Sequence, residues 1–150
     1  MRVVLAILLC SCFGLCDTIA DTSDNGFTLY LVRHAEKEAD GSRDPVLTQT
    51  GKDRSEKLGN WFTGKDLKEV WSSDYTRTRD TAKPMLAQLG LTLSIYDPGD
   101  QTELVKQLLE QQHNALVVGH SNTIPELARL LCQCTVTDID ESEHYCLIVI

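Results

Sequence analysis

Two histidines each follow a run of apolar residues that is typical of a buried strand. Arg33 and His34 come directly after the apolar run over 27–32, and His120 follows a shorter run over 115–118 and a glycine. The carboxyl ends of parallel strands meet at one edge of a sheet, where α/β proteins bind their ligands. The sequence therefore predicts that His34 and His120 share one site and are not separate core or capping histidines.

An arginine beside a histidine is suited to phosphoryl transfer. A neutral imidazole can attack phosphorus near neutral pH, and guanidinium groups match phosphate oxygens in bidentate fashion. We therefore expect His34 to be the nucleophile and Arg33 and Arg77 to bind the phosphate. His120 is expected to contact the phosphate and to stabilise charge in the transition state. Asn122 is a further candidate for substrate binding, although a helix N-cap role explains it equally well.

Three segments carry a resemblance to a known family. They are residues 31–37 (LVRHAEK), 72–82 (SSDYTRTRDTA) and 117–122 (VVGHSN). In these segments the chain resembles the histidine phosphatase superfamily, the phosphoglycerate-mutase-like group, and in size it resembles the short phosphohistidine phosphatases. The resemblance runs from about Phe27 to the chain end. It implies a covalent phosphohistidine on His34 and a reaction that uses no cofactor and no metal.

One feature departs from that family. Its mutases and many of its phosphomonoesterases carry a glutamate general acid before the second histidine, and others carry an acid directly after it, where this chain has Ser121. The middle region offers only Asp97, Asp100 and Glu103, none of them in a recognisable acid motif. The absence of an acid suits substrates whose leaving group needs little protonation, such as phosphohistidine, acyl phosphates or phosphoanhydrides.

Three functions are compatible with these residues. The first is hydrolysis of a phosphomonoester or phosphoramidate, on a small phosphorylated substrate or a phosphoprotein. The second is a metal-dependent hydrolase that uses His34, His120 and an acidic residue, and that would lose its activity to chelators. The third is a module that binds phosphoryl ligands without turnover. The intact set of two arginines and two histidines favours the first.

The composition is that of one globular domain, and it argues against nucleic acid as a partner. The 150 residues are 42% hydrophobic and 24% charged, which is enough to bury one core. A net charge of −8 and a sequence pI of about 4.9 leave no basic surface to follow a phosphate backbone. The cations near the two histidines should therefore form a local anion site. Nothing in the sequence defines the oligomeric state.

The first twenty residues have the pattern of a secretory signal peptide. Arg2 precedes an apolar segment that continues to Leu15 and is too short for a stable membrane span. The residues up to Ala20 are small or of a kind tolerated before a signal-peptide cleavage site. The predicted organisation is a signal peptide over 1–20, a flexible lead-in over 21–26 and one catalytic domain over 27–150. We therefore expect an exported protein, secreted or periplasmic. The alternatives are a lipid anchor on Cys12 and a first strand or helix of the fold.

Removal of that peptide would leave three cysteines, Cys132, Cys134 and Cys146. An odd number in an exported protein permits one disulfide and one thiol. Cys132 and Cys134 are too close in sequence to bridge easily within a helix, so we expect a bridge between Cys146 and one of them. Three reduced thiols are an equal alternative. The paired spacing typical of zinc ligands is absent.

Segments typical of strands and of helices alternate along the predicted domain. This alternation indicates a three-layer α/β/α sandwich with a mostly parallel central sheet. The expected strands lie near 27–32, 70–73, 91–96 (towards an edge), 115–118 and 146–150. The first expected helix begins at Thr48 or Thr50 and has Leu58, Trp61 and Phe62 on one face, and the second spans about 75–88. The third contains a stripe of Leu104, Leu108 and Leu109, and the fourth spans about 122–131.

Overall fold

The computed structural model describes residues 7–9, 26–144 and 146–150 of the chain. In that part of the chain, six strands form one sheet in the order β1-β6-β2-β5-β3-β4. The strands are β1 (Ile7–Leu9), β2 (Leu29–Arg33), β3 (Glu69–Ser73), β4 (Leu93–Tyr96), β5 (Ala115–Gly119) and β6 (Leu147–Val149). The helices are α1 (Gln49–Phe62), α2 (Thr76–Leu89), α3 (Thr102–Gln111) and α4 (Thr123–Cys132).

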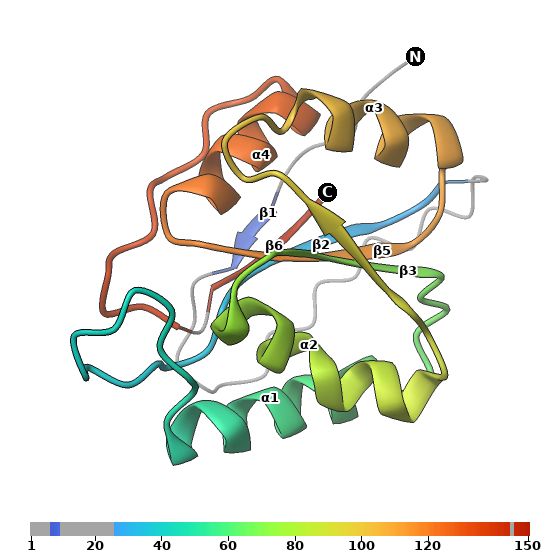
Figure 1. The fold of residues 1–150 in the computed structure, drawn as a ribbon. Helices are drawn as coiled ribbons and strands as arrows, with labels where there is room; N and C mark the ends of the chain where they lie inside the picture. Colours follow the sequence, from blue (N-terminus) through green and yellow to red (C-terminus); the bar gives the residue numbers. More distant parts are fainter. Residues whose placement is uncertain (1–6, 10–25, 145) are drawn as a thin grey trace.

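Helices cover both faces of the sheet, α1 and α2 on one face and α3 and α4 on the other (Figure 1). The four strands β2, β5, β3 and β4 are parallel, whereas β6 runs antiparallel to β2. The predicted three-layer α/β fold with a mostly parallel sheet is confirmed, and β4 lies at the edge of the sheet, as predicted.

Alternate residues of the two central strands face different helices, so each strand is buried on both sides. Leu31 of β2 and Val117 of β5 belong to the hydrophobic cluster under α3 and α4. Val32 and Val118, one position further on, belong to the cluster under α1 and α2. This double burial is the reason that the two segments read as continuous apolar runs. It also makes the strand ends a rigid frame for the residues that follow.

The register of β2 and β5 brings the two histidines together. Arg33 is paired with Gly119, the last residue of each strand, and the main-chain N–H of His34 donates to the carbonyl of Gly119 at 2.9 Å. Position 119 requires a glycine, because a Cβ there would lie 2.6 Å from the hydroxyl of Tyr96 and 2.9 Å from Cδ1 of Ile124. Because Arg33 and Gly119 are paired, the chain leaves β2 and β5 at the same level, and His34 and His120 follow in close contact.

Helix α1 begins at one of its two predicted starts, and α2 spans close to its predicted range. Thr48 is the N-cap of α1, where its side chain accepts from the N–H of Gly51, and Gly90 ends α2 with a left-handed φ of 66°. The start of α2 has no cap from its own N-cap residue. The carboxylate of Asp44 accepts from the N–H of Thr76 at 2.9 Å instead, so the loop after β2 is tied to the first turn of α2.

Two hydrophobic side chains expected on buried helix faces are exposed. Trp61 in α1 retains 46% of its surface and Leu109 in α3 retains 40%. The buried positions belong to their neighbours Phe62 and Leu108, because one residue along a helix turns the side chain by about a quarter turn. Trp61 instead packs edge-on against Tyr30 of β2.

The disulfide differs from the expected one. Cys132 is bonded to Cys134, and Cys146 is buried in the cluster under α3 and α4. The expectation assumed that both neighbouring cysteines lie within a helix. In fact α4 ends at Cys132 and Gln133 has a left-handed φ of 53°, which turns the chain so that the two Cα atoms are 5.2 Å apart.

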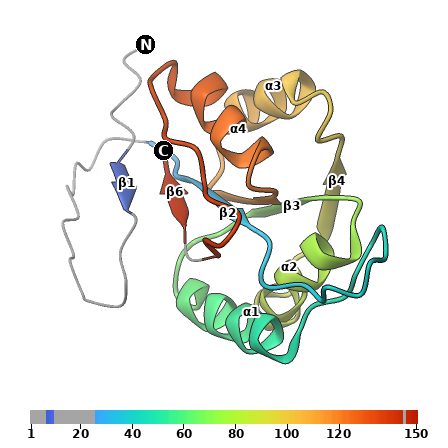
Figure 2. The same cartoon turned by 90° about the vertical axis from the view of Figure 1, so that its left-hand side faces the viewer.

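The N-terminal segment lies almost entirely outside the described residues, including Cys12 and the predicted cleavage site. Its one described part is β1, which pairs antiparallel with β6 at the edge of the sheet (Figure 2). The predicted signal peptide thus stays a prediction, and its removal would leave the other five strands in place. No helix among the described residues is long and apolar enough to cross a bilayer.

Candidate functional site

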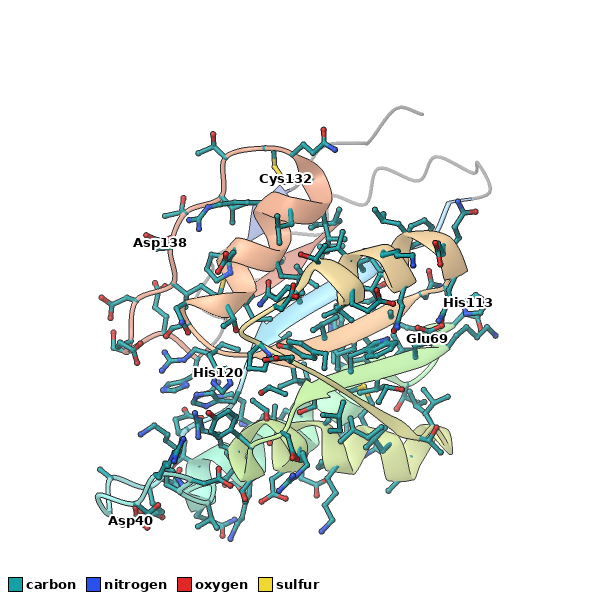
Figure 3. All side chains as sticks on the ribbon, turned by 45° about the horizontal axis from the view of Figure 1, so that its top comes forward. Asp40, Glu69, His113, His120, Cys132 and Asp138 are labelled. Atoms are coloured by element: carbon teal, nitrogen blue, oxygen red, sulfur yellow. A yellow bond between two sulfur atoms is a disulfide. The ribbon has the colours of Figure 1, made fainter. Side chains whose placement is uncertain are left out.

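The predicted site residues meet at the carboxyl ends of the central strands. His34 and His120 follow β2 and β5, and their ring centroids are 5.5 Å apart. Arg33 is the last residue of β2, and Arg77 lies in the first turn of α2. Figure 3 shows His120 at this end of the sheet, between the loop that carries Asp40 and the loop that carries Asp138. The structure thus brings together the four residues that the sequence placed in one site.

His34 presents an unprotonated nitrogen. Its Nδ1 lies 2.8 Å from the carbonyl oxygen of Ala35, and because a carbonyl can only accept, Nδ1 carries the proton and Nε2 keeps its lone pair. The residue is 3% exposed. This burial, reinforced by the charge of Arg33, lowers the pKa of His34 to about 3. The imidazole is therefore neutral and available as a nucleophile across the physiological pH range.

His120 is held from both sides of its ring. Nε2 lies 2.9 Å from the hydroxyl of Ser73, and an Nη2 of Arg77 lies 3.4 Å from Nδ1. A guanidinium can only donate, so Nδ1 accepts and Nε2 carries the proton towards Ser73. Burial, followed by the charges of Arg77 and Arg33, lowers the pKa of His120 to about 4. The ring of Tyr75 packs edge-on against this histidine at 5.1 Å.

Arg33 is buried and anchors a loop. Its Nη1 donates to the main-chain oxygens of Asp140, Glu141 and Glu143 at 3.0, 2.7 and 2.9 Å. Its Nη2 donates to a carboxylate oxygen of Glu141 at 3.1 Å. Together these bonds fix residues 133–144, which we call the C-terminal loop, over the ends of β2 and β5. Much of the positive charge of Arg33 is therefore directed at protein groups.

The Nε groups of both arginines are left for another acceptor. Nε of Arg33 and Nε of Arg77 are buried and have no hydrogen-bond partner in the described part of the chain. An unsatisfied buried donor costs about 1–3 kcal/mol, more for a charged group. A phosphate oxygen at each position would remove that cost. Two orphaned donors on arginines whose charges act on His34 are therefore candidates for binding an oxyanion.

The C-terminal loop adds two residues that the sequence analysis missed. Nδ1 of His144 lies 3.1 Å from the carbonyl oxygen of His34, and the two rings are 6.0 Å apart. The carboxylate of Glu141 accepts a short hydrogen bond from the hydroxyl of Ser121, the residue after His120. That hydrogen bond lowers the pKa of Glu141 below its usual range, so it is ionised near neutral pH. An irregular loop has no periodicity from which such contacts could be read.

The side chain of Asn122 does not cap helix α4. The residue occupies the N-cap position of α4 but its side chain makes no capping hydrogen bond, and it is exposed. The hydroxyl of Thr123, the first residue of α4, accepts from the main-chain N–H of His120 at 3.0 Å and so ties the start of the helix to the end of β5. A contact between Asn122 and a substrate therefore stays a prediction.

The three candidate acids of the middle region are exposed and engaged in local hydrogen bonds. Asp97 accepts from the N–H of Gly99 at 2.8 Å, Asp100 from Thr102 at 3.1 Å and Glu103 from Gln107 at 3.0 Å. Asp97 lines a shallow, open depression of about 460 Å³ next to Tyr75, whose ring packs against His120; the two histidines and two arginines of the site do not line it. Its other lining residues are Asp74, Ile95, Tyr96 and Pro98.

Among the described residues, no group of three or more His, Cys, Asp or Glu side chains is arranged to hold a metal ion. What the site can do is bind an oxyanion against two guanidinium groups and attack it with the Nε2 lone pair of His34. Both capabilities derive from the protein's own side chains.

Comparisons with known proteins agree with the fold. The family model for the histidine phosphatase superfamily (branch 1) matches residues 29–98, which include Arg33, His34 and Arg77. The protein histidine phosphatase SixA, solved with tungstate, is similar in structure with a TM-score of 0.60 at 21% identity, over 75% of this chain and 84% of that one. A putative phosphohistidine phosphatase SixA from Nakamurella multipartitia has a TM-score of 0.54 at 29% identity, over 67% and 63%.

A mycobacterial glucosyl-3-phosphoglycerate phosphatase is also similar, with a TM-score of 0.62 at 15% identity, over 72% of this chain and 80% of that one. No curated protein matches the sequence significantly.

The buried histidines predict a pH dependence of stability. In the folded protein His34 has a pKa of about 3, whereas in the unfolded chain its pKa is near 6.5, so below pH 6.5 only the unfolded chain takes up this proton. The free energy of unfolding should therefore fall as the pH falls, by about 2 kcal/mol from His34 alone between pH 7.5 and 5. Urea unfolding of the wild type and of His34→Asn at these two pH values measures this decrease in the free energy of unfolding. An equal decrease in both proteins would contradict the assignment.

Proposed function

The chain belongs to the histidine phosphatase superfamily, and from this premise we propose that it is a phosphatase that forms a covalent phosphohistidine on His34. The observation that carries the proposal is the Nε2 lone pair of His34 beside two buried guanidinium Nε–H groups that lack acceptors. The substrate would be a phosphomonoester or a phosphoramidate.

In the first step, the Nε2 lone pair of His34 attacks phosphorus. The bond from phosphorus to the leaving oxygen or nitrogen breaks, and its electron pair goes to the leaving group. Donors from Arg33 and Arg77 bind the non-bridging oxygens, whose geometry changes as the transition state forms. His120 adds a donor to them when its Nε2–H exchanges the hydroxyl of Ser73 for a phosphate oxygen. His34 needs no base for this step, because burial keeps its imidazole neutral.

In the second step, water attacks phosphorus and the bond to Nε2 breaks. The electron pair returns to the imidazole, and inorganic phosphate leaves. The same arginines bind the phosphoryl group in both steps, so the site binds one oxyanion throughout. No cofactor supplies any part of this chemistry, and Asn122 could contact the substrate from the exposed start of α4.

We infer the substrate class from the surroundings of the site. Asp97, Asp100 and Glu103 are engaged in their own turns or helix, so none is positioned to protonate a leaving group. The depression beside Tyr75 is shallow and open, which suits a small phosphorylated molecule or a phosphorylated side chain of a protein. We infer a substrate whose leaving group departs without strong acid assistance, phosphoramidates included.

We further propose that the protein is exported after cleavage near Ala20. The support is the charged start at Arg2, the short apolar segment to Leu15 and the small residues that follow. The N-terminal residue of the protein recovered from its native cell is the measurement. Asp21 is expected, a lipid-modified Cys12 would mean an anchor, and an intact Met1 would contradict export by cleavage.

Replacement of the nucleophile should abolish the reaction. In His34→Ala the attacking nitrogen is absent, so we expect neither turnover of p-nitrophenyl phosphate nor acid-labile labelling from a radioactive phosphoester. The wild type, quenched in base to preserve the phosphoramidate, should carry one label that peptide mapping places at position 34, also in the presence of EDTA. Labelling that persists in His34→Ala would eliminate the assignment. Loss of turnover to EDTA would favour a metal-dependent hydrolase, and phosphate binding without turnover would indicate a binding module.

The rate should depend strongly on the basicity of the leaving group. Without a proton donor, charge accumulates on the departing atom, and each 1.4 kcal/mol of missing stabilisation lowers the rate about tenfold. Aryl phosphates and phosphoramidates should therefore be cleaved much faster than alkyl phosphates under conditions where the first step limits turnover. Similar rates on aryl and alkyl esters would mean that a competent acid is present. The variants Asp97→Asn, Asp100→Asn and Glu103→Gln would then identify it by selective loss of alkyl activity.

A further inference from the structure

The carboxylate of Glu141, in the C-terminal loop, lies between the two strand ends that carry the histidines. Its Oε2 is 3.1 Å from Nη2 of Arg33, and its Oε1 accepts from the hydroxyl of Ser121. Arg33 ends β2, and Ser121 follows the histidine at the end of β5. Two hydrogen bonds from opposite sides therefore hold the group over the seam between β2 and β5.

The position of Glu141 is set by buried contacts of the loop around it. The guanidinium of Arg33, itself 5% exposed, donates to three main-chain oxygens of residues 140–143. Because these bonds are made by the backbone, they persist whatever side chain stands at position 141. The carboxylate itself is 83% exposed, so water can reach it and a proton on it can pass to solvent. The fold thus supplies a fixed and hydrated base at the site.

Glu141 is also electrostatically coupled to His120, because its negative charge acts to raise the pKa of that histidine. Other carboxylates around the site are already committed. Glu36 pairs with Arg54, and Asp44 caps the start of α2. Among the described carboxylates, Glu141 is the one in contact with Arg33 and with the residue beside His120.

We propose that Glu141 is the general base for the second step, hydrolysis of the phosphohistidine, and that Ser121 is its positioning residue. The water oxygen bonds to phosphorus while one of its protons goes to the Glu141 carboxylate. The bond from phosphorus to Nε2 of His34 breaks, and its electron pair returns to the imidazole. The proton then passes from Glu141 to solvent. The inference rests on the proposed function, since it needs a phosphohistidine to act on.

The same contacts permit a different role, which makes opposite kinetic predictions. A carboxylate on Arg33 competes with the substrate phosphate for the guanidinium, so its removal would tighten substrate binding and leave the chemical steps unchanged. A base for the second step affects the turnover of the phosphoenzyme and leaves its formation intact. Separate measurement of the two steps distinguishes these roles.

The test compares Glu141→Gln with the wild type on p-nitrophenyl phosphate, whose leaving group needs no proton. In rapid mixing, Glu141→Gln should release about one nitrophenolate per active site in a burst at the wild-type rate. It should then turn over about 100-fold more slowly than the wild type, the range expected for loss of a general base. Base-quenched samples should contain nearly stoichiometric phosphohistidine. The matched control is Asp138→Asn, an exposed carboxylate of the same loop that pairs with Arg129, and it should behave as the wild type.

Two further variants keep the inference falsifiable if Glu141→Gln is poorly folded. Ser121→Ala should slow the second step by a smaller factor, and combination with Glu141→Gln should add no further loss. Glu141→Ala should regain second-step turnover when formate supplies an external base, whereas His34→Ala should not respond.

A kcat of Glu141→Gln within twofold of the wild type would overturn the inference, as would a lower KM at unchanged kcat. Loss of the burst itself would place Glu141 in the first step and would also overturn it. If the wild type forms no phosphohistidine, the proposed function fails together with this inference. If the wild type forms it and Glu141→Gln behaves normally, only this inference fails.

Discussion

The buried guanidinium of Arg33 is the group on which the arrangement of this site depends. A buried charge is costly unless it is paired and hydrogen-bonded, and here three main-chain oxygens and the carboxylate of Glu141 supply that compensation. The compensation comes from a loop more than one hundred residues away in the sequence. That loop is thereby fastened over the strand ends, and Glu141 and His144 are brought beside His34.

Burial, followed by the charge of the two arginines, decides the protonation of the histidines. Removal from water disfavours the cationic form of an imidazole, and positive charge beside it acts in the same direction, so His34 and His120 are both neutral. For a nucleophile this state is required, because protonation of Nε2 would remove the attacking lone pair. An anion bound to the Nε groups of Arg33 and Arg77 offsets some of that positive charge. Substrate binding and the basicity of the histidines are therefore coupled.

How much the sequence predicts depends on whether a feature is local or periodic. The strands that carry Arg33 and His120 are apolar runs buried on both faces, so both the fold and the meeting of the two histidines could be inferred. The contact of Glu141 with Ser121 joins residues 20 positions apart across helix α4 and the irregular C-terminal loop, and the hydrogen bond from His120 to Ser73 spans 47. Such contacts depend on loop conformation and on register, which no residue pattern encodes. The bridge between Cys132 and Cys134 was missed for a similar reason, since it depends on one left-handed residue at a helix end.

The two chemical steps make different demands on the protein, and the structure meets them unequally. The second step has an ionised carboxylate exposed to water, whereas the two carboxylates at the depression beside Tyr75 are engaged elsewhere, Asp74 with Arg79 and Asp97 with the N–H of Gly99. Leaving groups that depart easily would therefore pass quickly into the phosphoenzyme, and hydrolysis of that intermediate would limit turnover. Basic leaving groups would be limited by the first step. A site with this imbalance selects its substrates by the bond to phosphorus more than by the shape of the molecule attached to it. This kind of selection is consistent with an open and shallow surface near a deeply buried nucleophile.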